Sequence, residues 1–197
     1  NIEIAKNGYN NTRSVALADL DGDGDLDLVT GNLGVNKLYL NTGNPPFFGE
    51  STDIGSDAEA TYSVALADVD GDGDLDLVVG NFGKADKLYL NNRGVGVFAS
   101  SGIEIGSGKL SGLSRYTNVV SLADVNGDGD VDLVASSKET NKLYLNIGKS
   151  PFFGGGIDIG GLEPEGRSVA LADVDGDGDL DLVEGNAETD KIYKNSS

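Results

Sequence analysis

The sequence predicts an all-β fold made of four copies of one four-stranded unit. An acidic segment of nine residues recurs four times, starting at Asp19, Asp68, Asp124 and Asp173, with steps of 49, 56 and 49 residues. Each unit also carries four short apolar runs separated by Gly, Asn and Asp, which is the pattern of strands joined by turns. The 197 residues include 30 Gly and few stretches that favour helix. Such a long internal period is typical of propellers and other repeat architectures.

The strands of a unit differ in character. The first and second are apolar on both faces and are expected to be covered on both sides, whereas the third is more polar, as an outer strand would be. In the first unit the four strands are expected near residues 14–18, 26–30, 37–41 and 53–54. Phenylalanines before the fourth strand are expected to fill the space between neighbouring units; they are Phe47, Phe48, Phe98, Phe152 and Phe153.

The two ends of the sequence indicate how the units are arranged. Ile2-Glu3-Ile4 has the pattern of a fourth strand, whereas the last unit stops after a third strand near residues 191–194. Adding the N-terminal strand to the last unit would remove a bare sheet edge, which favours a β-propeller of four four-stranded blades. We therefore predict a single β-propeller domain over residues 1–197, with repeats at about 14–55, 63–106, 119–160, and 168–197 completed by 1–5.

Three assemblies satisfy this pattern. The N-terminal strand can complete the last blade within one chain, giving a four-bladed ring. It can also act between chains, either in a dimer that forms eight blades or in an open series of subunits that exchange the strand. A head-to-tail contact of the last kind makes fibres unless it closes. The close similarity of the repeats fits either recent duplication or consensus design.

The acidic segment predicts a cation site, because four or five of its nine residues carry carboxylates that repel one another. If the nine places are counted from Asp19, the aspartates at places 1, 3 and 5 can each give one carboxylate oxygen. Gly24 at place 6 permits the turn that brings the chain back around an ion. The backbone carbonyl of Asp25, with its side chain toward water, and both oxygens of Asp27 bring the protein ligands to about six, and a water completes the shell that calcium prefers. Magnesium fits this crowded set less well, and a chain without His or Cys gives no soft ligands for zinc, iron or copper. The predicted ligands are Asp19, Asp21, Asp23, Asp25, Asp27, Asp68, Asp70, Asp72, Asp74, Asp76, Asp124, Asn126, Asp128, Asp130, Asp132, Asp173, Asp175, Asp177, Asp179 and Asp181.

Two other interpretations of the acidic segment are weaker. An EF-hand needs a Glu at place 12 and a helix on each side. Place 12 is occupied by Thr30, Val79, Ala135 and Glu184, and the residues that follow each segment read as strand. A solvated acidic linker would not recur four times at a fixed register between apolar runs.

The motif Asp-x-Asp-Gly-Asp-Gly-Asp-x-Asp between two β runs resembles the FG-GAP and VCBS-type repeats of calcium-binding β-propellers. Integrin alpha subunits and some secreted fungal lectins carry related repeats. The resemblance covers nearly the whole chain, and it implies that the acidic loop joins the first and second strands of each blade and holds calcium. Two features depart from the family pattern: the Gly-Ala-Pro half of the FG-GAP motif is absent, and four units stand where integrin-type propellers have seven blades.

The charge of the chain is concentrated in the acidic segments. The chain has 33 acidic and 14 basic residues, and the four segments hold 19 of the acidic ones, so the rest of the chain is balanced. With no basic stripe, binding to nucleic acid is not expected. No apolar run approaches the ~20 residues of a membrane span. Since the sequence begins at Asn1, we expect that any signal peptide has been removed or left out.

The calcium sites are expected to be structural, pinning the turn between two inner strands. A hydrolytic metal site needs an open position and a base, and no such constellation sits beside a segment. Extracellular calcium modules bind at ~10⁻⁴–10⁻³ M, so sites of this kind fill only outside the cell. These points favour a non-enzymatic extracellular module for adhesion, recognition or self-assembly. The alternatives are a carbohydrate-binding lectin and an enzyme such as a lyase or hydrolase that uses the propeller as a scaffold.

A glycan or protein ligand is expected on the face opposite the acidic segments. Four residues hold equivalent places just before each first strand there, and they either bind a sugar or peptide or satisfy the loop backbone; they are Arg13, Tyr62, Asn118 and Arg167. Residues 106–117 contain the insertion behind the longer step and mark the third unit for a specialised contact. Asn10 and Asn195 fit the N-glycosylation pattern.

Overall fold

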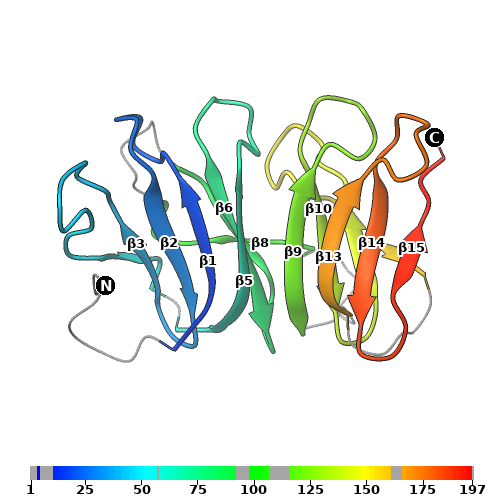
Figure 1. Ribbon diagram of the computed structural model, residues 1–197, viewed down its shortest axis with the longest axis horizontal. Helices are drawn as coiled ribbons and strands as arrows, with labels where there is room; N and C mark the ends of the chain where they lie inside the picture. The colour runs from blue at the N-terminus through cyan, green and yellow to red at the C-terminus, as the bar shows by residue number, and fades with distance from the viewer. Residues whose placement is uncertain are drawn as a thin grey trace.

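Short antiparallel strands joined by tight loops build the computed structural model, which describes residue 4 and residues 11–56, 58–91, 98–106, 116–160 and 166–196. The strands form four separate sheets, one for each predicted repeat, and within each sheet the strands pair in sequence order (Figure 1). The first sheet contains β1 (Thr12–Ala18), β2 (Asp27–Asn32), β3 (Asn36–Tyr39) and β4 (Thr52–Ile54). The second contains β5 (Ala60–Ala67), β6 (Asp76–Phe82), β7 (Lys87–Tyr89) and β8 (Ile103–Glu104). The third contains β9 (Thr117–Ala123), β10 (Asp132–Ser137), β11 (Asn141–Tyr144) and β12 (Ile157–Ile159), and the fourth contains β13 (Gly166–Ala172), β14 (Asp181–Asn186) and β15 (Lys191–Tyr193).

The sheets are the blades of a β-propeller, as predicted. The innermost strand of each blade packs against that of the next, so β1, β5, β9 and β13 follow one another around the axis. The loops that join the first and second strands of all four blades lie along one edge of the molecule, at the top of Figure 1. The turns between the second and third strands lie along the opposite edge. The two predicted faces are therefore present.

The inner strands are longer than the sequence predicted, and each contains a β-bulge. In the first blade Thr12 pairs with Asn32 and Ser14 pairs with Gly31, so Arg13 is the extra residue. The same shift in register occurs in the other three blades at Tyr62, Asn118 and Arg167. A bulge re-aims one side chain without ending the strand, which explains why strand pairing continues past the predicted start.

Apolar side chains fill the spaces between successive blades. One cluster joins Val29 and Leu38 of the first blade to Leu77 and Tyr89 of the second, and an equivalent cluster joins the second blade to the third. Phe98, Phe152 and Phe153 are buried in these clusters, which confirms their predicted role as fillers. Phe47 is an exception, because it is 39% exposed in the first blade.

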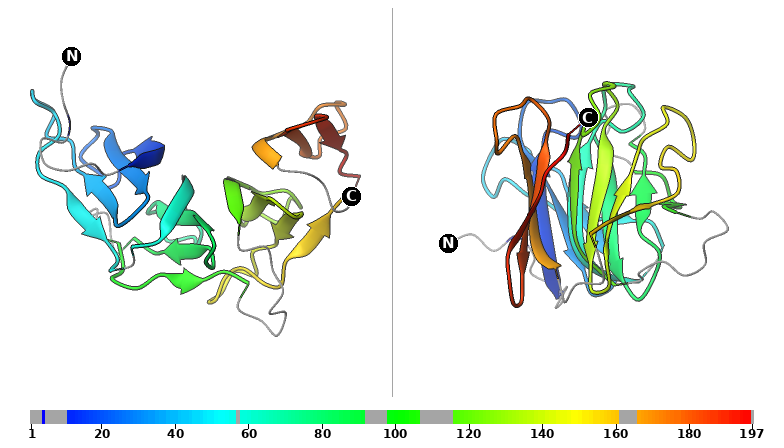
Figure 2. Two further views of the ribbon diagram at one scale, coloured as in Figure 1. Left: turned by 90° about the horizontal axis from the view of Figure 1, so that it is seen from below. Right: turned by 90° about the vertical axis from the view of Figure 1, so that its right-hand side faces the viewer.

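The four blades follow an arc in which the first and fourth blades lie at opposite ends (Figure 2). In this single chain they do not meet as they would in a closed four-bladed ring. The fourth blade has three strands among the described residues. The strand predicted over residues 1–5 to complete it lies outside those residues, apart from the exposed Ile4.

Candidate functional site

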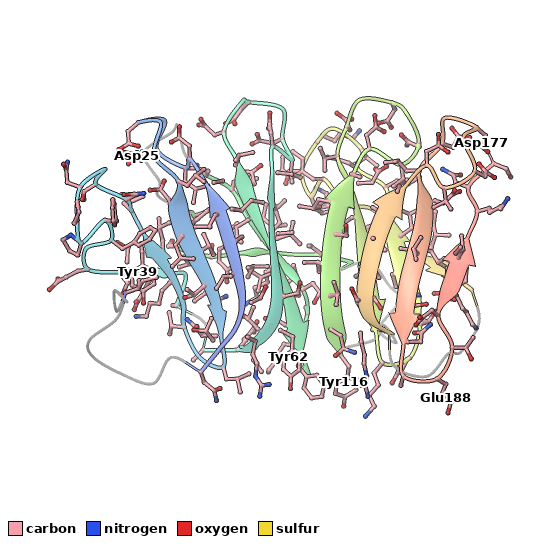
Figure 3. The ribbon with its side chains drawn as sticks, in the orientation of Figure 1. Asp25, Tyr39, Tyr62, Tyr116, Asp177 and Glu188 are labelled. Carbon is pink, nitrogen blue, oxygen red and sulfur yellow. The ribbon has the colours of Figure 1, made fainter. Side chains whose placement is uncertain are left out.

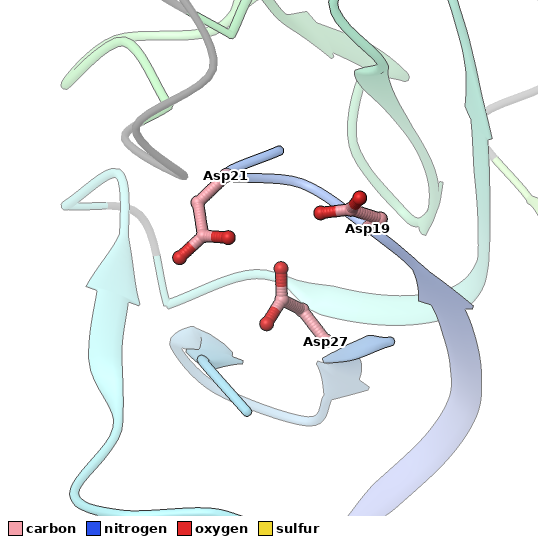
Figure 4. A group of neighbouring side chains, drawn as sticks. All are labelled: Asp19, Asp21 and Asp27. Carbon is pink, nitrogen blue, oxygen red and sulfur yellow. The ribbon is translucent and has the colours of Figure 1, made fainter. Parts of the chain in front are cut away.

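The acidic loops are presented along one edge of the propeller, where Asp25 and Asp177 are labelled in Figure 3. In three of the four loops, side-chain oxygens of three aspartates lie within 4.8 Å of one another. Figure 4 shows one such group, in which the carboxylates of Asp19, Asp21 and Asp27 converge. The other two groups are Asp68, Asp70 and Asp76, and Asp173, Asp175 and Asp181.

Hydrogen bonds within the loop set the directions of these carboxylates. Both oxygens of Asp19 accept from the backbone, one from Gly22 N at 2.8 Å and the other from Gly24 N at 3.0 Å. Asp21 accepts from the backbone N of Asp23 at 3.2 Å. Gly24 has a φ of 93°, a conformation that suits glycine and that allows the predicted turn. The loop therefore holds its shape through its own backbone.

The ninth residue of each loop is fully buried and anchors the loop to its blade. In the first blade the Oδ2 of Asp27 accepts from Leu20 N at 2.8 Å and its Oδ1 accepts from Asn41 N at 2.7 Å. The same pair of bonds is repeated in the other blades, at Asp76, Asp132 and Asp181.

An asparagine after each third strand also belongs to this site, although the sequence analysis did not select it. Besides its backbone bond to the buried aspartate, its side chain reaches the preceding blade in the second, third and fourth blades, whereas Asn41 of the first blade donates to Leu26 O of its own blade. The Nδ2 of Asn91 donates to Leu20 O at 3.1 Å, and the Nδ2 of Asn146 donates to Val69 O at 2.8 Å. The available signal was its recurrence at the end of Lys-Leu-Tyr-Leu-Asn.

The same contact bears on one predicted glycosylation site. The Nδ2 of Asn195, the atom to which an N-linked glycan attaches, donates to Val125 O at 2.8 Å. A glycan on Asn195 would replace one of its two amide hydrogens, so it would have to fit beside this bond between the third and fourth blades. Asn10, the other predicted site, lies outside the described residues.

The electrostatics of the loops favour a bound cation. Burial raises the pKa of Asp76 to about 6, and it also raises the pKa of Asp132, Asp21 and Asp70. Nearby carboxylates contribute to the raised pKa of each of these groups. A divalent ion would relieve both costs, since an opposite charge favours the ionised form. The all-oxygen donor set fits calcium.

Two ligand positions differ from the simple pattern. The third loop has the neutral Asn126 where the other loops have an aspartate, so it carries one negative charge fewer. Asn126 donates from Nδ2 to Asp128 Oδ2 at 2.8 Å. Asp25 was expected to point its side chain to water, but it is half-buried beside Gly43. A Cβ at Gly43 would lie 2.5 Å from Asp25 Oδ2, so the glycine makes room for this carboxylate.

A lysine side chain brings a positive charge to the fourth loop. Lys194 Nζ lies 2.9 Å from Asp175 Oδ2, whereas the equivalent residues of the other blades are Leu40, Leu90 and Leu145. The ion pair lowers the pKa of Asp175 and raises the pKa of Lys194. An ammonium group paired with a predicted ligand competes with a metal ion for the same carboxylate.

We therefore expect Lys194→Leu to strengthen calcium binding at the fourth loop by about two- to five-fold, the range that corresponds to an exposed ion pair. Calorimetric titration of calcium into the variant and the wild type measures the change. Lys84→Leu, which removes the same charge from the opposite edge, is the matched control. Equal calcium affinity in Lys194→Leu and wild type would contradict the competition.

The four residues predicted to bind a ligand are the bulged residues of the inner strands. The structure brings only two of them together: the guanidinium of Arg13 lies 5.5 Å from the centre of the Tyr62 ring. Asn118 instead donates from Nδ2 to Gly166 O at 2.9 Å and links the third blade to the fourth. Arg167 is an exposed residue of the fourth blade.

Two further aromatic residues extend the contact between Arg13 and Tyr62 into a row. Tyr62 stacks on Phe82 with ring centres 4.8 Å apart and planes inclined by 18°, and Phe82 meets Tyr116 edge to face, also at 4.8 Å. Tyr62 and Tyr116 lie on the edge opposite Asp25 and Asp177 (Figure 3). We call Arg13, Tyr62, Phe82 and Tyr116 the aromatic row. Sequence analysis missed Phe82 and Tyr116 as site residues, although Tyr116 lies in residues 106–117, which it marked for a specialised contact.

Comparison with protein families agrees with the acidic loops. A model of the FG-GAP-like repeat matches residues 19–79, 68–135 and 124–184, so that the matches span most of the chain. The chain belongs to the FG-GAP-like repeat family. Each match of this FG-GAP-like protein runs from the start of one acidic loop into the second strand of the next blade. No relative among curated protein sequences matches it.

Solved propeller-like structures share the fold of this FG-GAP-like protein. A structure describing recognition of non-reducing terminal N-acetylglucosamine by an Agrocybe aegerita lectin aligns with a TM-score of 0.60 and 24% identity, covering 85% of this chain and 45% of the lectin chain. A structure of BBS1N in complex with ARL6DN aligns with a TM-score of 0.55 and 14% identity, covering 94% of this chain and 58% of the other. This FG-GAP-like protein thus spans about half the length of both. Among the residues described, no helix has the length and apolar character that crossing a membrane requires.

Proposed function

We propose that this FG-GAP-like protein is a non-enzymatic, calcium-stabilised recognition module that works outside the cell. Calcium would be held by the first, third and ninth residues of each loop, and when bound it would neutralise their repulsion. Asp19 and Asp27 already use both oxygens to accept backbone N–H groups, so they act as fixed ligands and not as bases. The sequence contains no His or Cys, the common alternatives for general base and nucleophile.

The extracellular location rests on the kind of calcium site. Exposed loops of this type in extracellular modules bind calcium with dissociation constants of ~10⁻⁴–10⁻³ M, so they fill at the calcium concentrations found outside cells. The loops carry 19 of the 33 acidic residues of the chain, and without calcium that charge would stay concentrated on one edge.

The observation that carries the recognition role is the aromatic row on the edge opposite the loops. In this row Tyr116 is 37% exposed, and Tyr62 and Phe82 are half-buried. Aromatic rings with polar groups at their rim bind amphipathic ligands, because the ring contacts apolar surface while the rim makes hydrogen bonds. A sugar ring presents an apolar face of C–H groups surrounded by hydroxyls, and Arg13 and the two tyrosine hydroxyls can bond to such hydroxyls. We therefore propose a carbohydrate ligand. Since the Agrocybe aegerita lectin of the same fold is described as recognising non-reducing terminal N-acetylglucosamine, terminal sugars are the first probes.

A glycan array tests this proposal. We expect wild-type protein in millimolar calcium to bind a defined set of glycans, and the double variant Tyr62→Ala, Tyr116→Ala to bind them about thirtyfold more weakly, since each of the two ring contacts contributes about 1 kcal/mol. Phe47→Ala is the matched control, because it removes an exposed aromatic ring from the β3–β4 loop. Equal binding by the double variant would exclude the aromatic row, and an array without any bound glycan would contradict carbohydrate recognition.

A further inference from the structure

The two ends of the arc expose the apolar faces that are buried between blades elsewhere in the molecule. At the first blade, Val15 is 61% exposed, whereas its equivalent in the second blade, Val64, is 7% exposed. At the fourth blade, Val174 is 48% exposed and Ile192 is 55% exposed. Their equivalents in the second blade, Val69 and Leu88, are 3% and 0% exposed. We call the surface around Val15 the head face and the surface around Val174 and Ile192 the tail face.

The interfaces inside the chain show what such faces bind. Between the first and second blades, Gly31 leaves a hollow that receives Thr61 and Val64: a Cβ on this glycine would lie 2.8 Å from Thr61 Cγ2 and 2.9 Å from Val64 Cγ1. Between the second and third blades, Gly80 receives Thr117 and Val120 with distances of 2.9 Å to both.

The interface between the third and fourth blades is equally tight, but its glycine belongs to the following blade and not to the preceding one. In the third blade Ser136 occupies the position that Gly31 and Gly80 have in the first two blades. In the fourth blade Gly166 occupies the position of Thr61 and Thr117. A Cβ on Gly166 would lie 2.0 Å from Ser136 Oγ, so the contact is again tight. The chain thus makes the same blade-to-blade interface three times.

The head and tail faces carry the two unused halves of this interface. Gly185 of the fourth blade is equivalent to Gly31 and Gly80, but a Cβ there would meet only atoms of its own blade, the nearest at 3.6 Å. The hollow is therefore open at the tail face. Thr12 and Val15, the equivalents of Thr61 and Val64, are exposed at the head face.

Polar groups at the two faces match in the same way. Val64 N donates to Ser14 Oγ of the preceding blade at 3.2 Å, and Val120 N donates to Ser63 Oγ at 3.1 Å. The fourth blade has the equivalent Ser168, which is exposed at the tail face. The asparagine bond between blades has its two ends here as well. Asn41 of the first blade donates from Nδ2 to Leu26 O of its own blade, and its amide has a second N–H for a neighbouring blade, as Asn146 has when it bonds to both Val131 O and Val69 O. The equivalent acceptor is the carbonyl of Val174 in the fourth blade.

We propose that the tail face of one chain binds the head face of a second copy, with Thr12 and Val15 of the second copy seated on Gly185 of the first. The occupant is a second copy because the head face repeats the shape, the apolar residues and the hydrogen-bonding groups that the tail face would meet in a following blade. The contact joins two different surfaces, so it is heterologous and builds either a closed ring or a head-to-tail series. It requires no exchange of the N-terminal strand.

Sedimentation velocity in millimolar calcium tests the proposal with the wild type and two single variants. We expect wild-type chains to form species of two or more copies, and we expect Val15→Glu and Gly185→Leu to sediment as monomers. Both variants should fold, because Val15 is exposed and a Cβ at Gly185 meets no atom closer than 3.6 Å. Ile157→Glu, which places the same charge on an exposed strand residue of the third blade, is the matched control and should associate like the wild type.

A mixing experiment separates the two faces. Val15→Glu keeps an intact tail face and Gly185→Leu keeps an intact head face, so an equimolar mixture should contain a heterodimer joined through one native contact. A monomeric wild type over the whole concentration range would overturn the proposal. Association of either variant to the wild-type extent, or a mixture without heterodimer when the wild type associates, would overturn it as well.

Discussion

Removing calcium with EDTA should lower the melting temperature of this FG-GAP-like protein by about 10 °C relative to millimolar calcium. A site with a dissociation constant of ~10⁻⁴–10⁻³ M contributes on the order of 1 kcal/mol at that concentration, because the ion binds the folded loop and not the unfolded chain. Four sites would contribute about 4 kcal/mol, a large part of the ~5–15 kcal/mol that a typical domain has. Differential scanning calorimetry in the two buffers measures the shift.

A single-site variant shows whether the shift comes from the loops. Asp70→Ala removes one ligand of the second loop, where the wild-type side chain makes one long bond, from Asp72 N at 3.2 Å. The part of the shift that depends on calcium should fall by about a quarter in this variant, while the melting temperature in EDTA stays close to that of the wild type. Identical melting curves for the wild type with and without calcium would contradict a stabilising role.

The sequence predicted the blades and the acidic loops well because both are encoded locally. Alternation of apolar residues, the spacing of aspartates and the position of Gly24 all act within about ten residues, and the four-fold recurrence removes chance matches. The recurrence also showed that residues such as Arg13 and Tyr62 are equivalent. The observed bulges explain that equivalence, since each of these residues is the extra one in its strand.

What the sequence could not predict depends on neighbours from other blades. Val15 and Val64 both lie in the sequence Ser-Val-Ala-Leu-Ala, yet one is exposed and the other is buried, because only Val64 has a preceding blade to pack on. The aromatic row likewise combines Phe82 of the second blade with Tyr116 at the start of the third. No local pattern encodes such contacts between blades.

A buried carboxyl group between the second and third blades should make the stability of the protein depend on pH. The Oδ1 of Asp86 accepts from Asn81 N and its Oδ2 accepts from Thr117 Oγ1, both at 2.8 Å. Burial, with a smaller contribution from the neighbouring carboxylate of Glu59, raises the pKa of Asp86 to about 7. Glu59 itself pairs with Lys87 at 3.3 Å. In the first blade the equivalent residue is the neutral Asn36, which accepts the same backbone bond from Asn32 N at 2.9 Å.

The sign of the effect follows from the direction of the shift. The carboxyl group of Asp86 binds a proton more tightly in the folded chain than in the unfolded one, where its pKa is about 3.9. Its contribution to stability is therefore complete below pH ~4 and is lost as the pH rises toward 7. Between these values the free energy of unfolding should fall by up to about 1.4 kcal/mol for each pH unit from this group alone.

Asp86→Asn should remove this loss, since the amide is neutral at every pH and its carbonyl can keep the bond from Asn81 N. Urea unfolding from pH 4.5 to 8 should give a variant that gains stability relative to the wild type as the pH rises, and that is the more stable protein at pH 7. Comparing the two proteins at each pH cancels the titration of the acidic loops, which both share. Asp190→Asn, at the equivalent but exposed position of the fourth blade, is the matched control and should follow the wild-type profile. Parallel profiles for Asp86→Asn and the wild type would mean that Asp86 is ionised in the folded protein throughout this range.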